Sequence, residues 1–250
     1  MFDELINEIV KELESKESRK RSRSNAAQAA FEFAVRSILE DLWRDSLSFP
    51  PRESLMNLRS GYYSEAPRYR DRRLTYNQTK AAFDRMIECR FIEVTNKGYY
   101  SRERGAGGLT RYIATDRLVE RFEELEGHPA FVIQPDLDQE VIILRDKIND
   151  RQVNVDYNDI PKTEKFRSNL RQINEFFLKH WVDLRIKDTE VQRLAQRILQ
   201  DKDKEPIDLS RRTLARIFTN GSFEEGGRFY RGWWQNVPSE YRPYITIDEA

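Results

Sequence analysis

The chain has 250 residues, of which 34% are charged and 12% aromatic, and its 43 basic and 43 acidic side chains give a formal net charge of zero. This composition excludes a chain that is disordered throughout, because its hydrophobic residues suffice for a core, and no apolar run reaches the ~18 residues of a membrane helix. The first residues lack the basic start and cleavable core of a secretion signal, and a single cysteine, Cys89, excludes a disulfide framework. We expect an intracellular, cytoplasmic protein that needs no membrane, metal or cofactor.

The charge is distributed unevenly along the chain. Residues 51–111 hold 13 Lys and Arg against 7 Asp and Glu, a net charge of +6, whereas residues 1–18 and 112–150 carry −4 and −6. Such asymmetry indicates an anionic partner for one face of the molecule. An ordinary solvated surface of mixed charge is the alternative interpretation.

The first part of the chain is predicted to be helical. Apolar side chains at helical spacing over residues 2–13 predict an amphipathic helix, and its apolar stripe suggests assembly into a homo-oligomer. A basic arm at residues 19–23 completes an N-terminal segment of residues 1–25. A second helix should start at Asn25, its N-cap, and end at the Pro50-Pro51 pair. The inward-facing residues of the short helix expected next are Leu55, Met56 and Leu58.

The middle of the chain is the most informative stretch. Thr75 is a good N-cap for a helix that should end near Cys89, and extended runs at 90–95 and 109–115 flank a polar loop with four glycines. A further helix should follow directly. The order of these helices and strands resembles a winged helix-turn-helix domain, over residues 26–126.

This resemblance implies how the domain would bind DNA. In winged-helix proteins the third helix lies in the major groove, and the strand-loop-strand wing runs along the backbone or the minor groove. The expected recognition-helix residues are Tyr76, Asn77, Gln78, Lys80 and Arg85. The expected wing residues are Lys97, Arg102, Arg104 and Arg111.

The residue types fit these two roles, with one exception. Asn and Gln can bind adenine through two hydrogen bonds, and Lys and Arg suit phosphate. Asp84 lies on the same face of the expected recognition helix and would repel phosphate. It could instead pair with Lys80 or Arg85, or accept a hydrogen bond from a cytosine amine.

The second half of the chain predicts a smaller α+β domain. Residues 127–140 are expected to be a linker, and residues 141–250 the domain itself. A hairpin with Asn149-Asp150 in its turn should open the domain. A long helix is expected from Pro161, with Arg167 among the basic residues of its solvent-facing side. The whole chain is therefore expected to have an α+β fold that is mostly helical.

Arginine and aromatic residues alternate in the last forty residues. Such interleaving is typical of a groove that binds a single strand, where bases stack on the aromatic rings. The arginines that would line this groove are Arg211, Arg212, Arg216, Arg228 and Arg231. The alternative is that the aromatic residues form the core of this half and the arginines form its rim.

The same segment carries a second resemblance. The sequences RIFTNGSF, GGRFYRGWWQNVP and VNVDY are similar to proteins of phages, plasmids and other mobile elements, in which a winged helix precedes a polymerase-like replication module. The resemblance covers about residues 150–248. It implies a strand with a catalytic acid soon after this segment, but the chain stops at ITIDEA, so Asp248 is not assigned as a metal ligand.

Together these patterns predict a DNA-binding protein that acts in replication initiation or regulation of a mobile genetic element. The expected partner is double-stranded DNA, with a single strand at the C-terminal segment. No catalytic residue is assigned, because neither Cys89 nor the two histidines belong to a readable nucleophile arrangement. Two alternatives stay open: a protein-interaction or defence module without DNA contact, and the N-terminal fragment of a nucleotidyltransferase.

Overall fold

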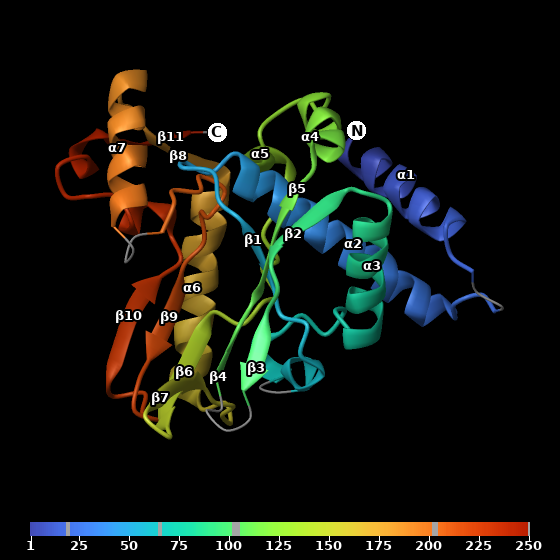
Figure 1. Cartoon of the computed structure of the whole chain (residues 1–250). Coiled ribbons are helices and arrows are strands. Elements are labelled where there is room, and N and C mark those ends of the chain that lie inside the picture. The colour runs from blue at the N-terminus through green and yellow to red at the C-terminus, as the bar shows by residue number, and fades with distance from the viewer. Residues whose placement is uncertain (19–20, 65–66, 102–105, 202–204, 250) are drawn as a thin grey trace. The chain divides into compact units, whose positions relative to one another are not determined.

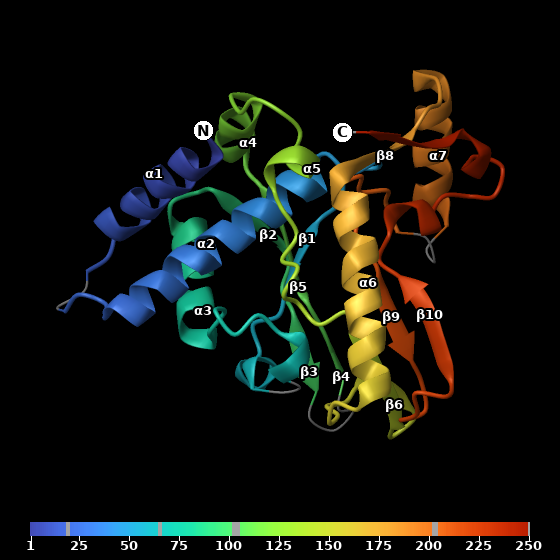
Figure 2. The ribbon, with the colours of Figure 1, turned by 180° about the vertical axis from the view of Figure 1, so that it is seen from behind.

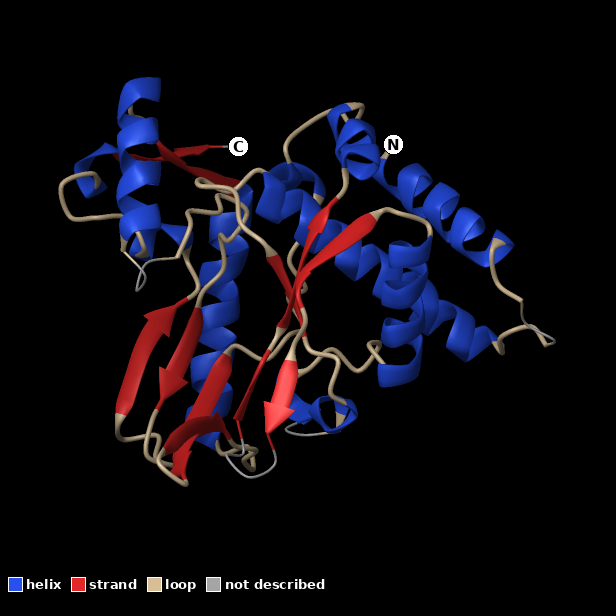
Figure 3. Cartoon of the chain, viewed as in Figure 1, coloured by secondary structure: helices blue, strands red, loops and turns tan. Residues whose placement is uncertain are grey.

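A computed structural model of the chain describes residues 1–18, 21–64, 67–101, 106–201 and 205–249; the others are grey in Figure 3. The fold is α+β, as expected from the sequence. The chain forms two compact units, which we call unit 1 and unit 2. Unit 1 contains Met1–Leu47, Pro51–Glu65 and Asp71–Ile133, and unit 2 contains Ser48–Pro50, Ala66–Arg70 and Gln134–Ala250.

The helices of unit 1 are α1 (Phe2–Ser15), α2 (Asn25–Ser46), α3 (Tyr76–Glu88), α4 (Asp116–Glu123) and the short α5 (Pro129–Val132), as Figure 1 shows. The N-cap of α2 is Ser24 and not Asn25, because the Ser24 hydroxyl accepts a hydrogen bond from the Ala27 N–H at 3.3 Å. The helix ends at Ser46, ahead of the predicted stop at Pro50.

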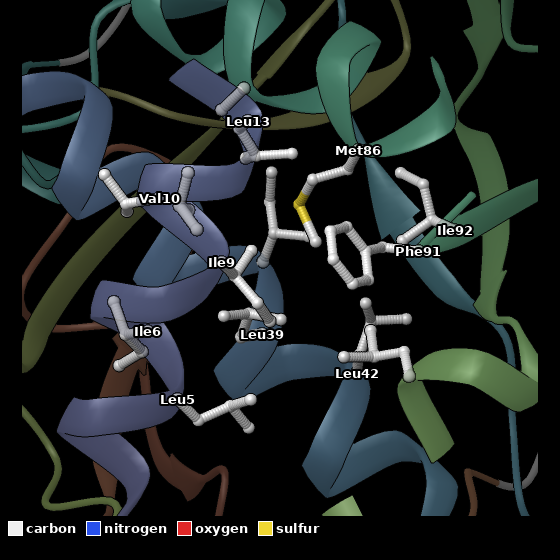
Figure 4. Close-up of a cluster of buried hydrophobic side chains, with 14 of the residues drawn as sticks. Leu5, Ile6, Ile9, Val10, Leu13, Leu39, Leu42, Met86, Phe91 and Ile92 are labelled. Atoms are coloured by element: carbon white, nitrogen blue, oxygen red, sulfur yellow. The ribbon is translucent and has the colours of Figure 1, made fainter. Parts of the chain in front are cut away.

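The core of unit 1 joins α1 to α2 and α3. Figure 4 shows Ile9 and Leu13 of α1 beside Leu39 of α2 and Met86 of α3, and all four side chains are almost completely buried. The apolar stripe predicted for residues 2–13 is therefore covered within this chain. This removes the reason for expecting a homo-oligomer through the N-terminal helix.

Unit 1 also contains a three-stranded antiparallel sheet. Its strands are β1 (Ser54–Met56), β2 (Ile92–Asn96) and β5 (Thr110–Ala114), in the order β1-β5-β2. The short helix predicted after Pro51 is wrong, because residues 54–56 pair with β5 as a strand. Leu55 is 53% exposed and does not face inward, since neighbouring residues of a strand point to opposite faces.

The connections of unit 1 contain further short elements. Between β2 and β5 the chain forms a separate hairpin of β3 (Tyr99–Ser101) and β4 (Ala106–Gly108). The short 3-10 helix η1 (Ser60–Tyr63) precedes α3 in unit 1, and η2 (Pro67–Tyr69) lies on the segment that belongs to unit 2.

Unit 2 is built on a four-stranded sheet in the order β10-β9-β6-β7, with β6 and β9 parallel and the other pairs antiparallel. Its strands are β6 (Ile142–Ile148), β7 (Arg151–Asn154), β9 (Ala215–Phe218) and β10 (Gly226–Tyr230). The predicted hairpin is confirmed: Asn149 and Asp150 connect β6 to β7 with φ angles of 49° and 63°. Two adjacent left-handed residues are what a two-residue type I′ turn requires.

The helix α6 (Pro161–Lys179) covers one face of this sheet, as Figures 1 and 2 show from opposite sides. Its Phe166 stacks on Phe218 of β9 with ring centroids 5.6 Å apart, and Leu170 is buried in the same cluster. The remaining elements are β8 (His180–Leu184), which pairs with β11 (Ile245–Glu249), α7 (Asp188–Gln200), η3 (Trp233–Gln235) and η4 (Arg242–Tyr244). In the part of the chain that the structure describes, no helix is both long and apolar enough to cross a membrane.

Two short segments from the first half of the chain complete unit 2. Phe49 and Ile207 exchange two backbone hydrogen bonds of 3.0 Å. The Tyr69 hydroxyl donates to the Val155 carbonyl at 2.7 Å and accepts from the Leu144 N–H at 3.1 Å. Because these partners lie on either side of the β6–β7 turn, residues 67–70 are held as part of the unit 2 fold.

Candidate nucleic-acid interface

The outward face of α3 is set by its buried side. The buried residues of α3 are Thr79, Ala82, Phe83 and Met86. The side chains of Lys80 and Asp84 are partly exposed and lie on the outward face. In the first turn Asn77 is exposed, and the half-buried Tyr76 ring lies 5.8 Å from the ring of Tyr63. The first turn therefore presents an exposed amide next in sequence to Tyr76, whose ring contacts Tyr63.

The predicted cations of α3 have acidic neighbours. Lys80 pairs with Asp84 at 2.5 Å, one of the arrangements expected for that aspartate, and Arg85 pairs with Glu88. Both pairs are one helical turn apart and lie at the surface, where such a pair contributes only about 0.2–0.5 kcal/mol. An approaching phosphate could therefore displace either carboxylate at little cost.

Gln78 is occupied by a contact that the sequence did not reveal. Its Oε1 accepts a hydrogen bond from Nε of Arg23 at 3.3 Å. The Arg23 side chain is only 3% exposed, lies 3.6 Å over the Phe31 ring and also pairs with Glu14. Arg23 is thus an internal contact of unit 1 and not part of a basic arm. Of the other arm residues Arg21 is exposed, while Arg19 and Lys20 lie outside the described residues.

The hairpin of β3 and β4 stands where the wing was predicted. Tyr99 and Tyr100 are 72% and 49% exposed, and the Arg59 guanidinium lies 5.0 Å from the Tyr100 ring centroid. A side chain at Gly107 would place its Cβ 2.1 Å from the Tyr99 carbonyl oxygen, so the two strands approach as closely as glycine allows. The expected tip residues Arg102 and Arg104 lie outside the described residues.

The two described cations of the predicted wing differ in their surroundings. Lys97 is exposed, and within the described ranges it forms no ion pair. Arg111 lies on β5 and pairs with Glu53 at 3.1 Å. Hydrogen bonds from Thr95 and Arg111 lower the pKa of Glu53, so this pair is charged at neutral pH.

Tyr76, a predicted recognition-helix residue, belongs to a set of exposed or half-buried tyrosines whose other members the sequence did not reveal. Tyr62 and Tyr63 are in edge contact, with ring centroids 5.4 Å apart, and Tyr63 in turn contacts Tyr76. Arg59 belongs to the same short segment and lies against Tyr100. We call Tyr62, Tyr63, Tyr76, Tyr99 and Tyr100 the tyrosine surface. The sequence shows a loop rich in Tyr and Arg at this point, but a loop has no periodicity from which to place its side chains.

Two arginines of the predicted C-terminal groove are packed against aromatic rings of unit 2. Arg212 is 4% exposed, lies 5.0 Å from the Trp181 ring and donates to the His180 carbonyl at 3.2 Å, and burial lowers its pKa. Arg216 lies 4.2 Å from the Phe166 ring centroid and donates to the Gly227 carbonyl at 2.9 Å. The prediction that these two line an open groove is wrong, because the Arg212 guanidinium packs against the Trp181 ring and the Arg216 guanidinium against the Phe166 ring.

The other three arginines of that prediction keep an accessible surface. Arg211 pairs with Glu205 at 3.2 Å and with Asp208 at 3.3 Å. Arg228 and Arg231 are exposed, the first on β10 and the second directly after it. The structure thus divides the five arginines: Arg212 is buried, Arg211 and Arg216 are half-buried, and Arg228 and Arg231 are exposed.

Two aspartates of unit 2, Asp156 and Asp159, form ion pairs with arginines. Asp156 and Asp159 share Arg68, and Asp159 also pairs with Arg167. Arg167 therefore does not belong to a solvent-facing basic side of α6. Among the described residues, no group of three or more His, Cys, Asp or Glu side chains is placed to hold a metal ion.

Comparison of the chain with protein-family models, with curated proteins and with solved structures finds no match.

Proposed function

We propose that the chain is a DNA-binding protein whose unit 1 is a winged helix-turn-helix domain for duplex DNA. The observation that carries this proposal is the order of elements after residue 75. The helix α3 is followed by β2, by the exposed β3–β4 hairpin and then by β5, which pairs with β2. This is the order of recognition helix, strand, wing and strand that the resemblance implies. One element departs from it, because β1 and η1 stand where a short helix was expected.

The proposed contacts divide into two kinds. Asn77, at the start of α3, is free to reach a base edge in the major groove, where an amide can bind adenine. Lys97 and the tyrosine surface contact the phosphate backbone, which sets the position of the protein without reading sequence. The chain as a whole acts in replication initiation or regulation of a mobile genetic element. That role is supported by the resemblance of residues 150–248.

The proposal is tested by measuring binding of the full chain to labelled duplexes at several salt concentrations. We expect Lys97→Gln to weaken binding to all duplexes alike and to lower the salt slope by about 0.9. We expect Asn77→Ala to flatten sequence preference, with a loss of about 1–3 kcal/mol on the preferred site. Lys11→Gln, which removes an exposed charge from α1, is the matched control.

Two outcomes would decide against the proposal. If Lys97→Gln and Lys11→Gln bind equally, the hairpin is not a wing that contacts DNA. If the chain retains no duplex at low salt but captures a stable protein partner, it is an interaction module instead.

A further inference from the structure

The face of the unit 2 sheet opposite α6 has an apolar centre. Ile143 of β6 and Ala215 and Ile217 of β9 are buried and form a cluster with the half-buried Tyr69. The residues that follow Ile143 and Ile217 in their strands, Leu144 and Phe218, belong to the cluster beneath α6. The strand alternation therefore assigns each residue of the sheet to one of two faces.

Three arginines belong to the face opposite α6 or to its margin. Arg145 lies two residues after Ile143 on β6, and Arg228 of β10 is paired with Ile217, so both are on this face. Arg231 directly follows β10 with a φ of 86°, a left-handed conformation that turns the chain at the end of the strand.

These three arginines are not neutralised by acidic side chains. The Nε of Arg145 donates to the Asn154 Oδ1 at 3.2 Å, and Nη1 of Arg231 donates to the Gln139 Oε1 at 3.3 Å. Within the described part of unit 2, none of the three forms an ion pair, whereas the nearby Arg211 has two acidic partners. Each of these two neutral amides accepts one hydrogen bond from its guanidinium and leaves the positive charge in place.

The charge of Arg231 is close enough to those of Arg145 and Arg211 to be affected by them. Arg231 keeps an exposed surface, yet the packed chain around its guanidinium lowers its pKa, and the charges of Arg211 and Arg145 lower it further. Like charges held together without a counter-charge oppose folding. A bound anion would remove this repulsion, so the cluster is arranged for an anionic ligand.

An aromatic ring lies on the same face. Tyr230 of β10 pairs with Ala215, which places its side chain opposite α6, and it is 44% exposed. Its neighbour Phe229 points to the other face, where Arg216 lies 5.8 Å from its ring. An exposed ring among guanidiniums can stack on an unpaired base while the cations bind phosphates. In a duplex the base faces are already stacked and are closed to such a ring.

We propose that this face of unit 2 binds single-stranded nucleic acid, with Arg145, Arg228 and Arg231 on the phosphates and Tyr230 stacked on a base. The site is independent of the duplex-binding proposal for unit 1, because it uses other residues and another form of nucleic acid. It also differs from the groove predicted from the sequence, since Arg212 and Arg216 are replaced by Arg145 and Tyr230.

The test is fluorescence anisotropy of the full chain with a labelled 20-nucleotide oligo(dT) between 50 and 300 mM NaCl. We expect Arg228→Gln combined with Arg231→Gln to weaken binding at least tenfold at low salt. The salt slope should fall by about 1.4, which is ~0.7 for each phosphate that an arginine no longer neutralises. The matched control combines Arg193→Gln with Arg197→Gln. It also removes two exposed arginines, but these are paired with Glu190 and Glu240.

The aromatic contribution is tested separately. Tyr230→Ala should weaken oligo(dT) binding by about fivefold to 150-fold, as expected for loss of one stacked base, whereas Tyr230→Phe should bind as the wild type does. Tyr244→Ala removes another exposed tyrosine of unit 2 and should have no effect.

A photocrosslink to the unaltered protein gives a readout that does not depend on how a variant folds. With a 5-bromouracil oligonucleotide, the crosslink should map to Tyr230 or its neighbours in β10. Crosslinks confined to unit 1, equal affinities of the arginine variant and its control, or tighter binding of an acidic peptide than of oligo(dT) would each overturn the proposal. Loss of oligo(dT) binding in the arginine variant while duplex binding persists would support it and leave the function of unit 1 a separate question.

Discussion

Glu140 offers the sharpest test of what holds unit 2 together. The residue precedes β6 and is 8% exposed. Its Oε2 accepts from Nη1 of Arg68 at 3.1 Å and pairs with Nη2 of Arg167 at 2.9 Å. Its Oε1 accepts from the backbone N–H groups of Val141 and Ile142 at 3.0 and 2.9 Å. One carboxylate therefore joins the start of a central strand, α6 and the segment 67–70.

The substitution Glu140→Ala should destabilise unit 2 by about 3 kcal/mol. Removing one partner of a buried ion pair costs about 3–5 kcal/mol, mostly because the other charge stays buried without compensation. The lower end applies here, because Arg68 and Arg167 remain partly open to solvent and keep Asp159. Glu140→Gln retains the shape and an acceptor oxygen, so we expect a loss of about half that size.

The pH dependence adds a second signature. Burial alone would raise the pKa of Glu140, but hydrogen bonds from Arg167, the Ile142 N–H and Arg68 outweigh it, and the pKa lies below its ordinary value of 4.5. A carboxyl with a lowered pKa in the folded state stabilises the fold above its unfolded pKa. That contribution should be lost as the pH falls below about 4.5, and Glu140→Gln should lack this part of the acid sensitivity.

Hydrogen exchange of the full chain, read by mass spectrometry on peptides from residues 142–148, reports on unit 2 alone. A loss of 3 kcal/mol corresponds to roughly a hundredfold faster exchange of protected amides. Glu164→Ala, an exposed glutamate on α6, is the control. Exchange in Glu140→Ala within threefold of that control would show that the ion pairs contribute little and that the reasoning from burial is wrong.

Three further predictions concern unit 1. Leu39→Ala should lower its stability by about 2–5 kcal/mol, because the side chain is completely buried, and the shift in thermal unfolding followed by circular dichroism measures this. Gly107→Val should disrupt the β3–β4 hairpin, since the new Cβ would meet the Tyr99 carbonyl. We expect the affinity for duplex DNA to fall while the unfolding temperature stays near that of the wild type. An unchanged affinity would argue against the proposal that this hairpin is a wing. Burial raises the pKa of the Cys89 thiol, so its reaction with a disulfide reagent at pH 8 should be at least about tenfold slower than in urea.

The sequence predicts helices and turns correctly where they depend on residues that are close together in the chain. The stripe of α1 follows from helical spacing, and the β6–β7 turn follows from an Asn-Asp pair that tolerates left-handed angles. Residues 54–56 were mistaken for a helix because a three-residue strand has no periodicity of its own. Its conformation depends on pairing with β5, more than fifty residues later in the chain.

Side chains of the candidate sites were also hard to place from the sequence where their positions depend on contacts that are distant in the chain. Arginine and aromatic residues alternate near the C-terminus, but the alternation does not tell which guanidiniums lie inside. The registers of β9 and β10 decide this, placing Arg216 against α6 and Arg228 on the opposite face. Arg167 is likewise drawn into the fold by Glu140 and by Asp159, contacts that helical spacing alone does not reveal.

The position of segment 67–70 in the chain has a consequence for synthesis on the ribosome. Arg68 and Tyr69 belong to unit 2, but their partners at Glu140, Leu144 and Val155 are translated more than seventy residues later. At about 5–20 residues per second, this segment waits on the order of several seconds for the strand on which it packs. During that interval a chaperone or a protease can reach two side chains that are later held inside the protein, and unit 2 cannot complete its fold from its C-terminal residues alone.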